Sequence, residues 1–441
     1  MNDEIKLALE TLEGTLTASV DLVWVMLGAF LVFFMHTGFA MVEAGFTRAK
    51  NAVNILMKNF LTISLGGIVY FLAGYAVMFG DSVGGFFGFS GFALSGVEDV
   101  GFFVFQAMFA ATCATIISGA VAERTNITAY FGIIVLMTLL VYPVVGHWVW
   151  GGGWLSELGF VDFAGSTVVH LTGAAAAFVA AAMIGPRIGK YAGKRVNVIP
   201  GHSIPLGALG VFILWLGWFG FNGASTLAAD PSAVPGVIAN TFLAASAGVV
   251  ATAIYTKIRY GYMDGSLTLN GALAGLVSIT AGAGNLDFWG ALAAGLISGV
   301  ILVEAVRLIE HKVKVDDPVG AVTVHGVVGI WGTLAVGLLD TAGGGLLYGG
   351  GAELLGIQAI GVIAVLAWTT ITTAAGLALI KVFVPLRVPA EEEIKGLDVV
   401  EHGSSAYEMQ DVFKGVTRSS DSFAQRLTTL GHSSNVQDKK A

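Results

Sequence analysis

Long apolar segments limit the possible folds of this sequence more than any other feature. A helix that crosses a membrane needs about 20 mostly apolar residues. On that basis we expect spanning helices at 21–45, 52–79, 102–122, 127–149, 163–184, 205–226, 237–259, 266–283, 289–309, 319–339 and 355–384. These runs are too continuous for the short alternating strands of an outer-membrane barrel. The sequence therefore predicts an all-α polytopic membrane protein with eleven transmembrane helices.

The composition excludes several other classes of protein. Hydrophobic residues make up 55% of the chain and charged residues 12%, whereas soluble domains carry about 25% charged residues. A soluble enzyme and a disordered chain are both excluded. The net charge of -8 leaves no basic face for nucleic acid. The single cysteine, Cys113, excludes a disulfide framework and a cysteine-based metal site. We expect no enzymatic activity, no metal and no cofactor.

The basic residues predict the orientation of the chain. When the connections are assigned alternately to two faces, all 22 Lys and Arg residues except Lys6 fall on one face. Basic residues gather on the cytoplasmic side of membrane proteins. We therefore expect a multi-pass protein of the cell membrane with its N-terminus outside and its C-terminus in the cytoplasm. The acidic N-terminal segment lacks the pattern of a cleaved signal peptide.

Two stretches of sequence resemble each other and predict an internal repeat. Asp162 and Asp317 are each followed by Gly at +3, Val at +7 and His at +8. The first and sixth expected helices also share the pattern Leu-Gly-Ala, Val-Phe and Gly. Helices five apart run in opposite directions, which predicts an inverted repeat of five plus five helices, with substrate at the repeat interface. We expect repeats at about 21–184 and 205–339 within a membrane domain at 1–384, and a tail at 385–441.

The two histidines of this repeat, His170 and His325, are predicted to meet near the middle of the membrane. Eight residues of helix rise about 12 Å, and the hydrocarbon core is about 30 Å thick. Ionisable groups in a bilayer are costly and usually face a functional cavity. Two histidines alone make a poor metal site, since zinc usually takes at least three protein ligands. We expect neutral imidazoles that exchange hydrogen bonds with a small polar solute.

A set of aromatic residues indicates a cation path. Most aromatic residues of membrane helices are packing or interfacial residues, and Trp148 and Trp215 are expected to be so. Trp150 is followed by three glycines, which allow an unusual backbone that holds its indole over a cavity. An indole face attracts a small cation by about 0.5–2 kcal/mol. Ser225 is expected at the same depth, where its hydroxyl could accept a hydrogen bond from that cation.

These motifs resemble those of the ammonium transporter family (Amt/Mep/Rh), and its Amt branch more than its Rh branch. The resemblance covers roughly residues 20–410. The motifs that carry it are Val149-Trp150-Gly-Gly-Gly153, Asp162-Phe-Ala-Gly-Ser-Thr-Val-Val-His170, Gly217-Trp-Phe-Gly-Phe-Asn-Gly-Ala-Ser225, Asp317-Pro-Val-Gly-Ala-Val-Thr-Val-His-Gly326 and Gly396-Leu-Asp-Val-Val-Glu-His-Gly-Ser-Ser-Ala-Tyr407.

The resemblance implies a homotrimer with a conduction path in each protomer. It also implies roles for individual residues, taken by motif position. The implied roles are outer ammonium recruitment for Phe109, Trp150 and Ser225, with Asp162 behind them; a phenyl gate of Phe109 and Phe221; and a pore lined by the twin histidines His170 and His325 and by Trp218. Capping of a helix N-terminus is an equally weighted and compatible role for Asp162.

The expected function is transport of ammonium or ammonia, with methylammonium as an analogue. An unpaired ion in hydrocarbon is prohibitively costly, so we expect deprotonation near the gate and passage of ammonia along the histidines. A first alternative is an ammonium receptor that signals through its tail. The second is an Rh-like gas channel, for which a wall that recruits cations would have no purpose.

The tail is expected to have a regulatory or structural role. By resemblance, residues 396–407 form a docking surface for a PII-type signalling protein at the inner exits. Equally weighted is a structural brace that packs against inner loops such as 185–203. Residues 411–441 contain no recognised motif, and their polar composition predicts a mostly disordered segment.

Overall fold

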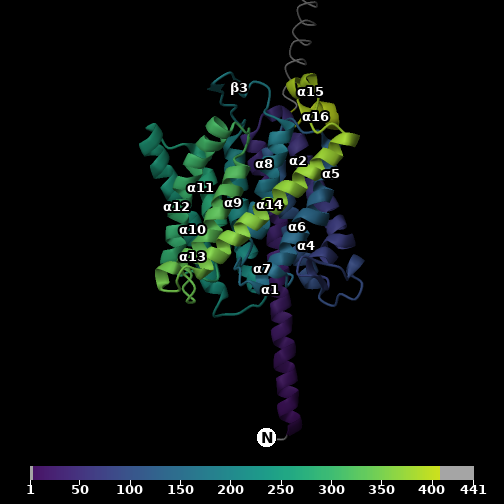
Figure 1. Cartoon of the computed structure of the whole chain (residues 1–441), viewed down its shortest axis with the longest axis vertical. Helices are drawn as coiled ribbons and strands as arrows, with labels where there is room; N and C mark the ends of the chain where they lie inside the picture. The colour runs from purple at the N-terminus through teal and green to yellow at the C-terminus, as the bar shows by residue number, and fades with distance from the viewer. Residues whose placement is uncertain (1–2, 408–441) are drawn as a thin grey trace, which may run out of the picture.

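The computed structural model describes residues 3–407 and is a bundle of nearly parallel helices (Figure 1). The long helical elements are α1 (Asp3–Phe46), α2 (Ala52–Val69) with η2 (Tyr70–Gly74) and α3 (Tyr75–Phe79), α4 (Val100–Ala120), α5 (Ile127–Leu136) with η4 (Met137–Val141) and α6 (Tyr142–Val149), η5 (Ser166–Leu171) with α8 (Thr172–Ile184), α9 (Ile204–Gly223), α10 (Val234–Tyr260), α11 (Gly265–Thr280), α12 (Phe288–Arg307) with η7 (Leu308–Val313), η8 (Val322–Val327) with α13 (Val328–Leu339), and α14 (Glu353–Phe383).

Short elements connect these helices at both ends of the bundle. They are η1 (Ala49–Asn51), η3 (Phe92–Leu94), α7 (Trp154–Glu157), η6 (Ala224–Thr226), η9 (Leu346–Tyr348), α15 (Ala390–Lys395) and α16 (Leu397–His402). Two antiparallel hairpins complete the described residues: β1 (Ser82–Val83) pairs with β2 (Phe87–Gly88), and β3 (Tyr191–Ala192) pairs with β4 (Arg195–Val196).

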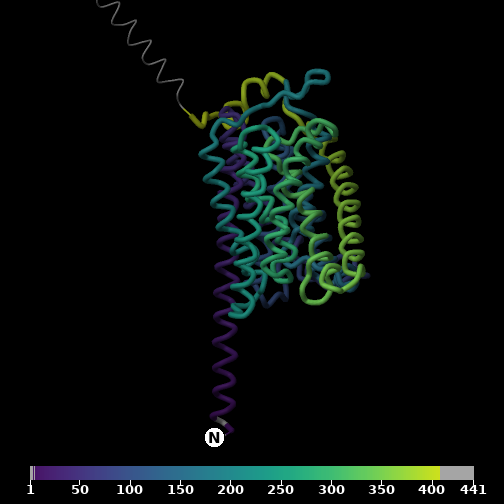
Figure 2. The backbone as a smooth tube through the Cα atoms, turned by 90° about the vertical axis from the view of Figure 1, so that its left-hand side faces the viewer, coloured from purple at the N-terminus to yellow at the C-terminus, as the bar shows by residue number. Residues whose placement is uncertain are grey.

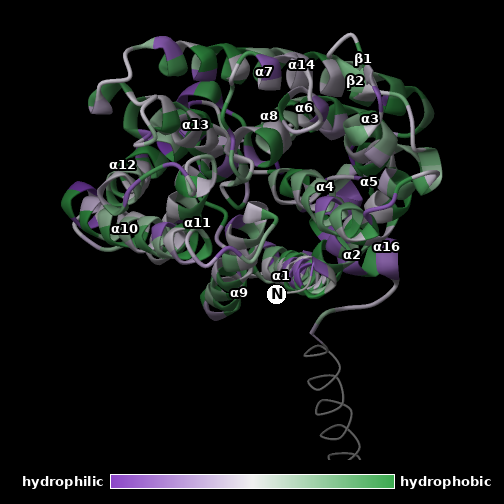
Figure 3. Ribbon diagram, turned by 90° about the horizontal axis from the view of Figure 1, so that it is seen from below, coloured by the Kyte–Doolittle hydropathy of each residue, from purple (hydrophilic) through white to green (hydrophobic). Residues whose placement is uncertain are grey.

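The helices confirm a multi-pass membrane protein with about ten to eleven spans. Within residues 3–407, ten helical stretches are long and apolar enough to cross a membrane, and α11 is a shorter apolar helix. Helix α11 has 16 residues, fewer than the about 20 of a typical span. Hydrophobic residues cover much of the outside of the bundle in the end-on view of Figure 3, as lipid contact requires.

The two ends of the bundle carry different segments of the chain. The tail face carries α15, α16 and the β3–β4 hairpin, whereas the first turns of α1 project from the opposite, N-terminal face (Figures 1 and 2). The first helix is therefore longer than the predicted 21–45, because it begins at Asp3. Gly14 is the only residue before position 21 that disfavours a helix strongly, and a single Gly does not end one.

Helices α1 and α9 pack against each other through glycines. A Cβ atom added at Gly45 would lie 2.4 Å from the backbone nitrogen of Gly207, and one at Gly210 would lie 2.6 Å from the carbonyl oxygen of Gly38. Small residues let membrane helices approach closely enough for extensive van der Waals contact. This contact fixes α9, and with it the aromatic residues at its far end, against α1.

Candidate functional site

The histidine-bearing helices begin with an aspartate cap. Asp162 Oδ1 accepts a hydrogen bond from Gly165 N at 3.0 Å, and its Oδ2 accepts bonds from Thr167 N at 2.9 Å and Val168 N at 2.8 Å. The side chain of Asp162 is buried. The cap satisfies backbone donors at the start of η5 that would otherwise lack a partner. Asp162 therefore fixes the first turn of the helix that carries His170.

Asp317 caps the second histidine helix in the same way. Its Oδ1 accepts a hydrogen bond from Ala321 N at 3.0 Å, and its Oδ2 accepts one from Val322 N at 2.8 Å. Both capped segments begin as wide π-helical turns, η5 and η8, and each turn contains its histidine. The wide turns are frequent at functional sites. The caps thus place both imidazole rings on rigid backbone.

The structure brings His170 and His325 together. Their ring centroids are 5.1 Å apart with an interplanar angle of 22°, and their Nδ1 atoms are 3.1 Å apart. Both side chains are buried, with 0% and 4% exposed surface. Two facing nitrogens form a hydrogen bond only if one carries a proton and the other does not. In a neutral pair the two rings are therefore opposite tautomers, and their Nε2 atoms are the free ends of the pair.

Aromatic rings extend this pair toward the N-terminal face. Phe221 stacks on His170 at 5.5 Å between centroids, and Phe109 stacks on Phe221 at 4.1 Å. Trp150 meets Phe109 edge to face at 6.2 Å. Phe109 and Phe221 are 1% and 0% exposed, so the two phenyl rings leave no room for a hydrated ion between Trp150 and the histidines.

Two tryptophans are oriented by hydrogen bonds. Trp150 Nε1 donates to the backbone oxygen of Asp162 at 2.8 Å, which connects the outermost ring to the capped helix. Trp218 stacks on His170 at 5.1 Å, and its Nε1 donates to Thr280 Oγ1 at 2.9 Å. Buried indoles usually need such a partner for their N–H group. Both rings therefore have a fixed orientation.

Ser225 lies in η6, and its hydroxyl is already bonded within its own segment. Its Oγ donates to the backbone oxygen of Phe221 at 2.8 Å. A hydroxyl that donates its proton keeps its lone pairs free to accept a hydrogen bond. Like Trp150, Ser225 is partly exposed, so both residues are open to solutes beyond the phenyl rings.

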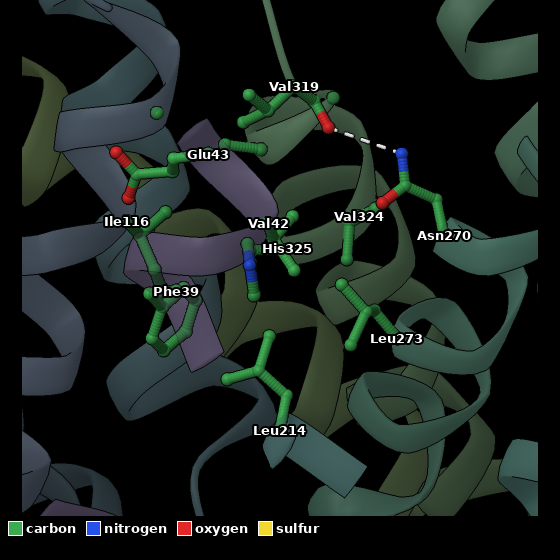
Figure 4. A pocket seen from close by; sticks show the side chains of 13 residues that line it. Phe39, Val42, Glu43, Ile116, Leu214, Asn270, Leu273, Val319, Val324 and His325 are labelled. Carbon is green, nitrogen blue, oxygen red and sulfur yellow. Dashed lines mark hydrogen bonds between the residues drawn. The ribbon is translucent and has the colours of Figure 1, made fainter. Parts of the chain in front are cut away.

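A small cavity lies next to His325 on the side of the tail face (Figure 4). Its volume is about 20 Å³, and Phe39, Glu43, Gly119 and Asn270 are among its lining residues. Phe39 is tilted by 43° against His325 at a centroid distance of 6.0 Å. A cavity needs about 10–15 Å³ to hold one water. This cavity therefore has room for one water-sized molecule.

Phe39 and the polar residues around the cavity were not among the site residues predicted from the sequence. Lys58 lies inside α2, within the predicted span 52–79, and is 1% exposed, so it is a buried basic residue. The detectable signal was an acidic and a basic residue within apolar helices, Glu43 and Lys58. Ionisable residues in such positions are rare and usually functional.

The tail is held against the bundle by polar contacts. Asp398 Oδ1 accepts a hydrogen bond from Asn54 N at 2.9 Å, and Glu401 Oε1 accepts one from Ile127 N at 2.9 Å. His202 Nε2 and the Tyr407 hydroxyl are 2.8 Å apart. Burial raises the pKa of Glu401. Residues 390–407 therefore form a docked segment, whereas the expectation for 411–441 lies outside the described residues.

Buried ion pairs support the tail face beneath this segment. Arg187 forms a two-point contact with Asp316, with Nε–Oδ2 and Nη2–Oδ1 distances of 2.9 Å, and also lies 3.5 Å from Glu123. Burial alone would raise the pKa of Asp316, but the hydrogen bonds and charge of Arg187 lower it to about 2. Glu393, in the tail, pairs with Arg387 at 2.7 Å and accepts a hydrogen bond from Ile188 N.

Comparisons with known proteins give a consistent result. The model of the Ammonium Transporter Family matches residues 23–407. Ammonium transporter Amt2 of Archaeoglobus fulgidus is 41% identical over 424 residues, or 90% of each chain. A putative ammonium transporter of Synechocystis is 40% identical over 413 residues, which cover 90% of this chain and 91% of its own.

Solved structures with this fold are also similar to the chain. A protein named Sensor Amt Protein has a TM-score of 0.85 and 38% identity, over 88% of this chain and 100% of its own. Mep2 of Candida albicans has a TM-score of 0.79 and 29% identity, over 85% of this chain and 87% of its own.

Proposed function

Since the chain belongs to the ammonium transporter family, we propose that it moves ammonia and a proton across the membrane through the path described above. The single observation that carries the proposal is the buried contact of 3.1 Å between the Nδ1 atoms of His170 and His325. The two imidazole rings are polar groups at the end of a stack of aromatic rings, in a path that is otherwise apolar.

Recruitment of the cation is the first step of the proposed mechanism. The faces of Trp150 and Phe109 attract an ammonium ion electrostatically, by about 0.5–2 kcal/mol each. The Ser225 hydroxyl accepts one N–H hydrogen bond from the ion. The orientation of Trp150, fixed through the backbone oxygen of Asp162, supports this role. Asp162 adds negative charge behind the site and so completes recruitment.

Deprotonation follows at the phenyl gate. The stacked rings of Phe109 and Phe221 exclude a hydrated ion, and burial of a bare cation in hydrocarbon would cost tens of kcal/mol. Ammonium avoids this cost because it can release a proton and continue as neutral ammonia. Potassium has no proton to release, so we propose that the gate rejects it.

The histidine pair then interacts with both ammonia and the released proton. Neutral imidazoles exchange hydrogen bonds with ammonia, and Trp218 keeps the His170 ring in place. The released proton can travel through the pair, since His170 Nε2 is buried without a partner and can accept it. The proton on Nδ1 then crosses to the second ring, and His325 Nε2 releases a proton toward the tail face.

Assembly and topology complete the proposal. We place the N-terminus outside and the tail face in the cytoplasm, in agreement with the basic residues there. The eleven spans form two inverted repeats at about 21–184 and 205–339 plus a last helix, within a membrane domain at 1–384. Three protomers assemble into a trimer. The docked part of the tail at 385–441 binds a PII-type protein or braces the bundle.

A receptor is the second candidate function. The similar structure named Sensor Amt Protein favours it, together with the tight docking of residues 390–407 on the bundle. In that case binding of ammonium at the outer site would be transmitted to the tail, and transport would be secondary.

Uptake into liposomes tests the transport proposal. Purified protein is reconstituted, and uptake of radiolabelled methylammonium is compared between the wild type and a His170→Ala, His325→Ala double variant. We expect uptake by the double variant to fall to the level of empty liposomes. Uptake equal to that of the wild type would contradict the proposed path and would favour the receptor.

A further inference from the structure

An acidic side chain lies just past the histidine pair on the side of the tail face. Glu43 follows Phe39 by four residues, one turn along α1, and both line the small cavity beside His325. Figure 4 shows Phe39 and Glu43 on one side of His325, and Asn270 and Leu273 on the other. Glu43 is 2% exposed. Figure 4 shows the carboxylate end of Glu43 pointing away from His325, so a proton released by His325 would have to cross the cavity to reach it.

One polar residue binds this carboxylate, and a buried lysine binds the backbone of that residue. Ser118 Oγ donates to Glu43 Oε2 at 2.6 Å, and Lys58 Nζ donates to the backbone oxygen of Ser118 at 2.9 Å. Ser118 and Lys58 are 0% and 1% exposed. We call Glu43, Ser118 and Lys58 the Glu43–Lys58 cluster. It joins α1, α2 and α4 and contains one group of each charge, and its acidic member is a lining residue of the cavity beside His325.

A purely structural role does not account for this cluster. Apolar side chains of similar volume would hold three helices together at least as well, because burial of two charges is costly. Ionisable residues in a membrane usually mark ion or proton pathways. Glu43 is also one of the residues that line the cavity beside His325. Position and chemistry together indicate a role in moving protons.

We propose that Glu43 is the proton acceptor on the tail-face side of the histidine pair. Because Nδ1 of His325 contacts His170, Nε2 is the nitrogen of His325 that can release a proton. In the transfer, the Nε2–H bond of protonated His325 breaks, a water in the cavity carries the proton, and an O–H bond forms on a Glu43 carboxylate oxygen. His325 becomes neutral, and Glu43 becomes a neutral carboxylic acid.

Lys58 and the nearby solvent complete the cycle. The positive charge of Lys58 stabilises the carboxylate before the proton arrives, so that Glu43 is ready to accept it. Glu43 then loses its proton to water at the tail face and recovers its negative charge. Ammonia follows the same tunnel as a neutral molecule and recombines with a proton in that water. The inference rests on the proposed transport function, to which it adds the proton acceptor.

The test measures charge and substrate on the same proteoliposomes. Currents on solid-supported membranes after a methylammonium jump give the charge moved, and radiolabelled methylammonium gives the uptake. The ratio of charge to uptake is compared for the wild type, Glu43→Gln and Glu43→Asp. We expect at least a tenfold lower ratio in Glu43→Gln with uptake retained, and a ratio near that of the wild type in Glu43→Asp, which keeps a carboxylate.

A second variant controls for folding. Glu43→Gln leaves Lys58 buried without its acidic partner, whereas the double variant Glu43→Gln, Lys58→Met removes both charges. The double variant is also expected to retain uptake and to lose charge movement at least tenfold. If the single variant does not fold, this double variant carries the test.

Three results would overturn the inference. One is an unchanged ratio of charge to uptake in Glu43→Gln and in the double variant. Another is an equal loss of charge and uptake in folded protein, which would make Glu43 a structural residue. The third is uptake without charge movement in the wild type, which would leave transport intact but provide no proton for Glu43. Absence of both signals in the wild type would instead contradict the proposed transport function.

Discussion

Removal of the Asp162 carboxylate should destabilise the helix that carries His170. Asp162→Ala removes the acceptor of three backbone N–H groups, at 3.0, 2.9 and 2.8 Å. A buried donor without a partner costs about 1–3 kcal/mol, so we expect a loss of about 3–9 kcal/mol. Proteins are typically stable by only about 5–15 kcal/mol. We therefore expect a large fall in the melting temperature of the detergent-solubilised protein and a parallel loss of methylammonium uptake.

Two further variants make this prediction quantitative. Asp317→Ala removes the acceptor of two hydrogen bonds instead of three, at 3.0 and 2.8 Å, and should lower the melting temperature less. Asp162→Asn keeps one side-chain oxygen as an acceptor and should lie between the wild type and Asp162→Ala. A melting temperature of Asp162→Ala within two or three degrees of the wild type would refute the reasoning, as would a larger effect of Asp317→Ala.

Three further predictions concern cation recruitment, the cavity beside His325 and the tail face. Trp150→Leu should raise the KM of ammonium-induced currents by about 2–30-fold, because about 0.5–2 kcal/mol of cation binding is lost; an unchanged KM would exclude Trp150 from recruitment. Gly119→Ala would place a Cβ atom 2.5 Å from Val319 Cγ2 beside the cavity next to His325. Uptake of methylammonium should therefore fall severalfold, and the free energy of unfolding should fall by about 1–3 kcal/mol. Normal uptake would contradict a substrate path through this cavity. Because the pKa of Asp316 is lowered to about 2, its ion pair with Arg187 should add about 2 kcal/mol to the free energy of unfolding above pH 4. This contribution is lost as the pH falls toward 2. Melting curves of Asp316→Asn should therefore lack this part of the acid dependence.

The fold was largely predictable because it follows from local properties of the sequence. Hydrophobic length identified the spanning segments, and the repeated Asp-to-His spacing pointed to His170 and His325 as a pair, which the structure places in contact. The predicted helix boundaries were less accurate, because they rested only on the length of the apolar run. Helix α1 begins at Asp3, well before the predicted start at position 21. The first turns of α1 precede the apolar run that hydropathy identifies, so hydropathy could not predict where this helix begins.

The part of the site on the side of the tail face could not be predicted because its residues are far apart in the sequence. Glu43, Lys58 and Ser118 come from three helices, and no spacing motif joins them. Their contact depends on how α1, α2 and α4 cross, which is set by three-dimensional packing. Ser225 is a milder case, because its position was expected but its bond to the Phe221 backbone oxygen depends on the turn at the end of α9.

Under the proposed mechanism, the opposite tautomers of the two histidines limit how often protons can pass. Each transfer exchanges the tautomers of the two rings. The Nδ1 atom that donated the hydrogen bond between the rings then becomes its acceptor. A second proton cannot travel in the same direction until both imidazoles reorient, because a backward transfer would restore the original tautomers only by returning the first proton to its starting side. Trp218 and Phe221 stack on His170 and hinder its rotation. If protons follow the proposed path, a recovery step must therefore separate successive charges, and the speed of that step would set an upper limit on the current that one chain can carry.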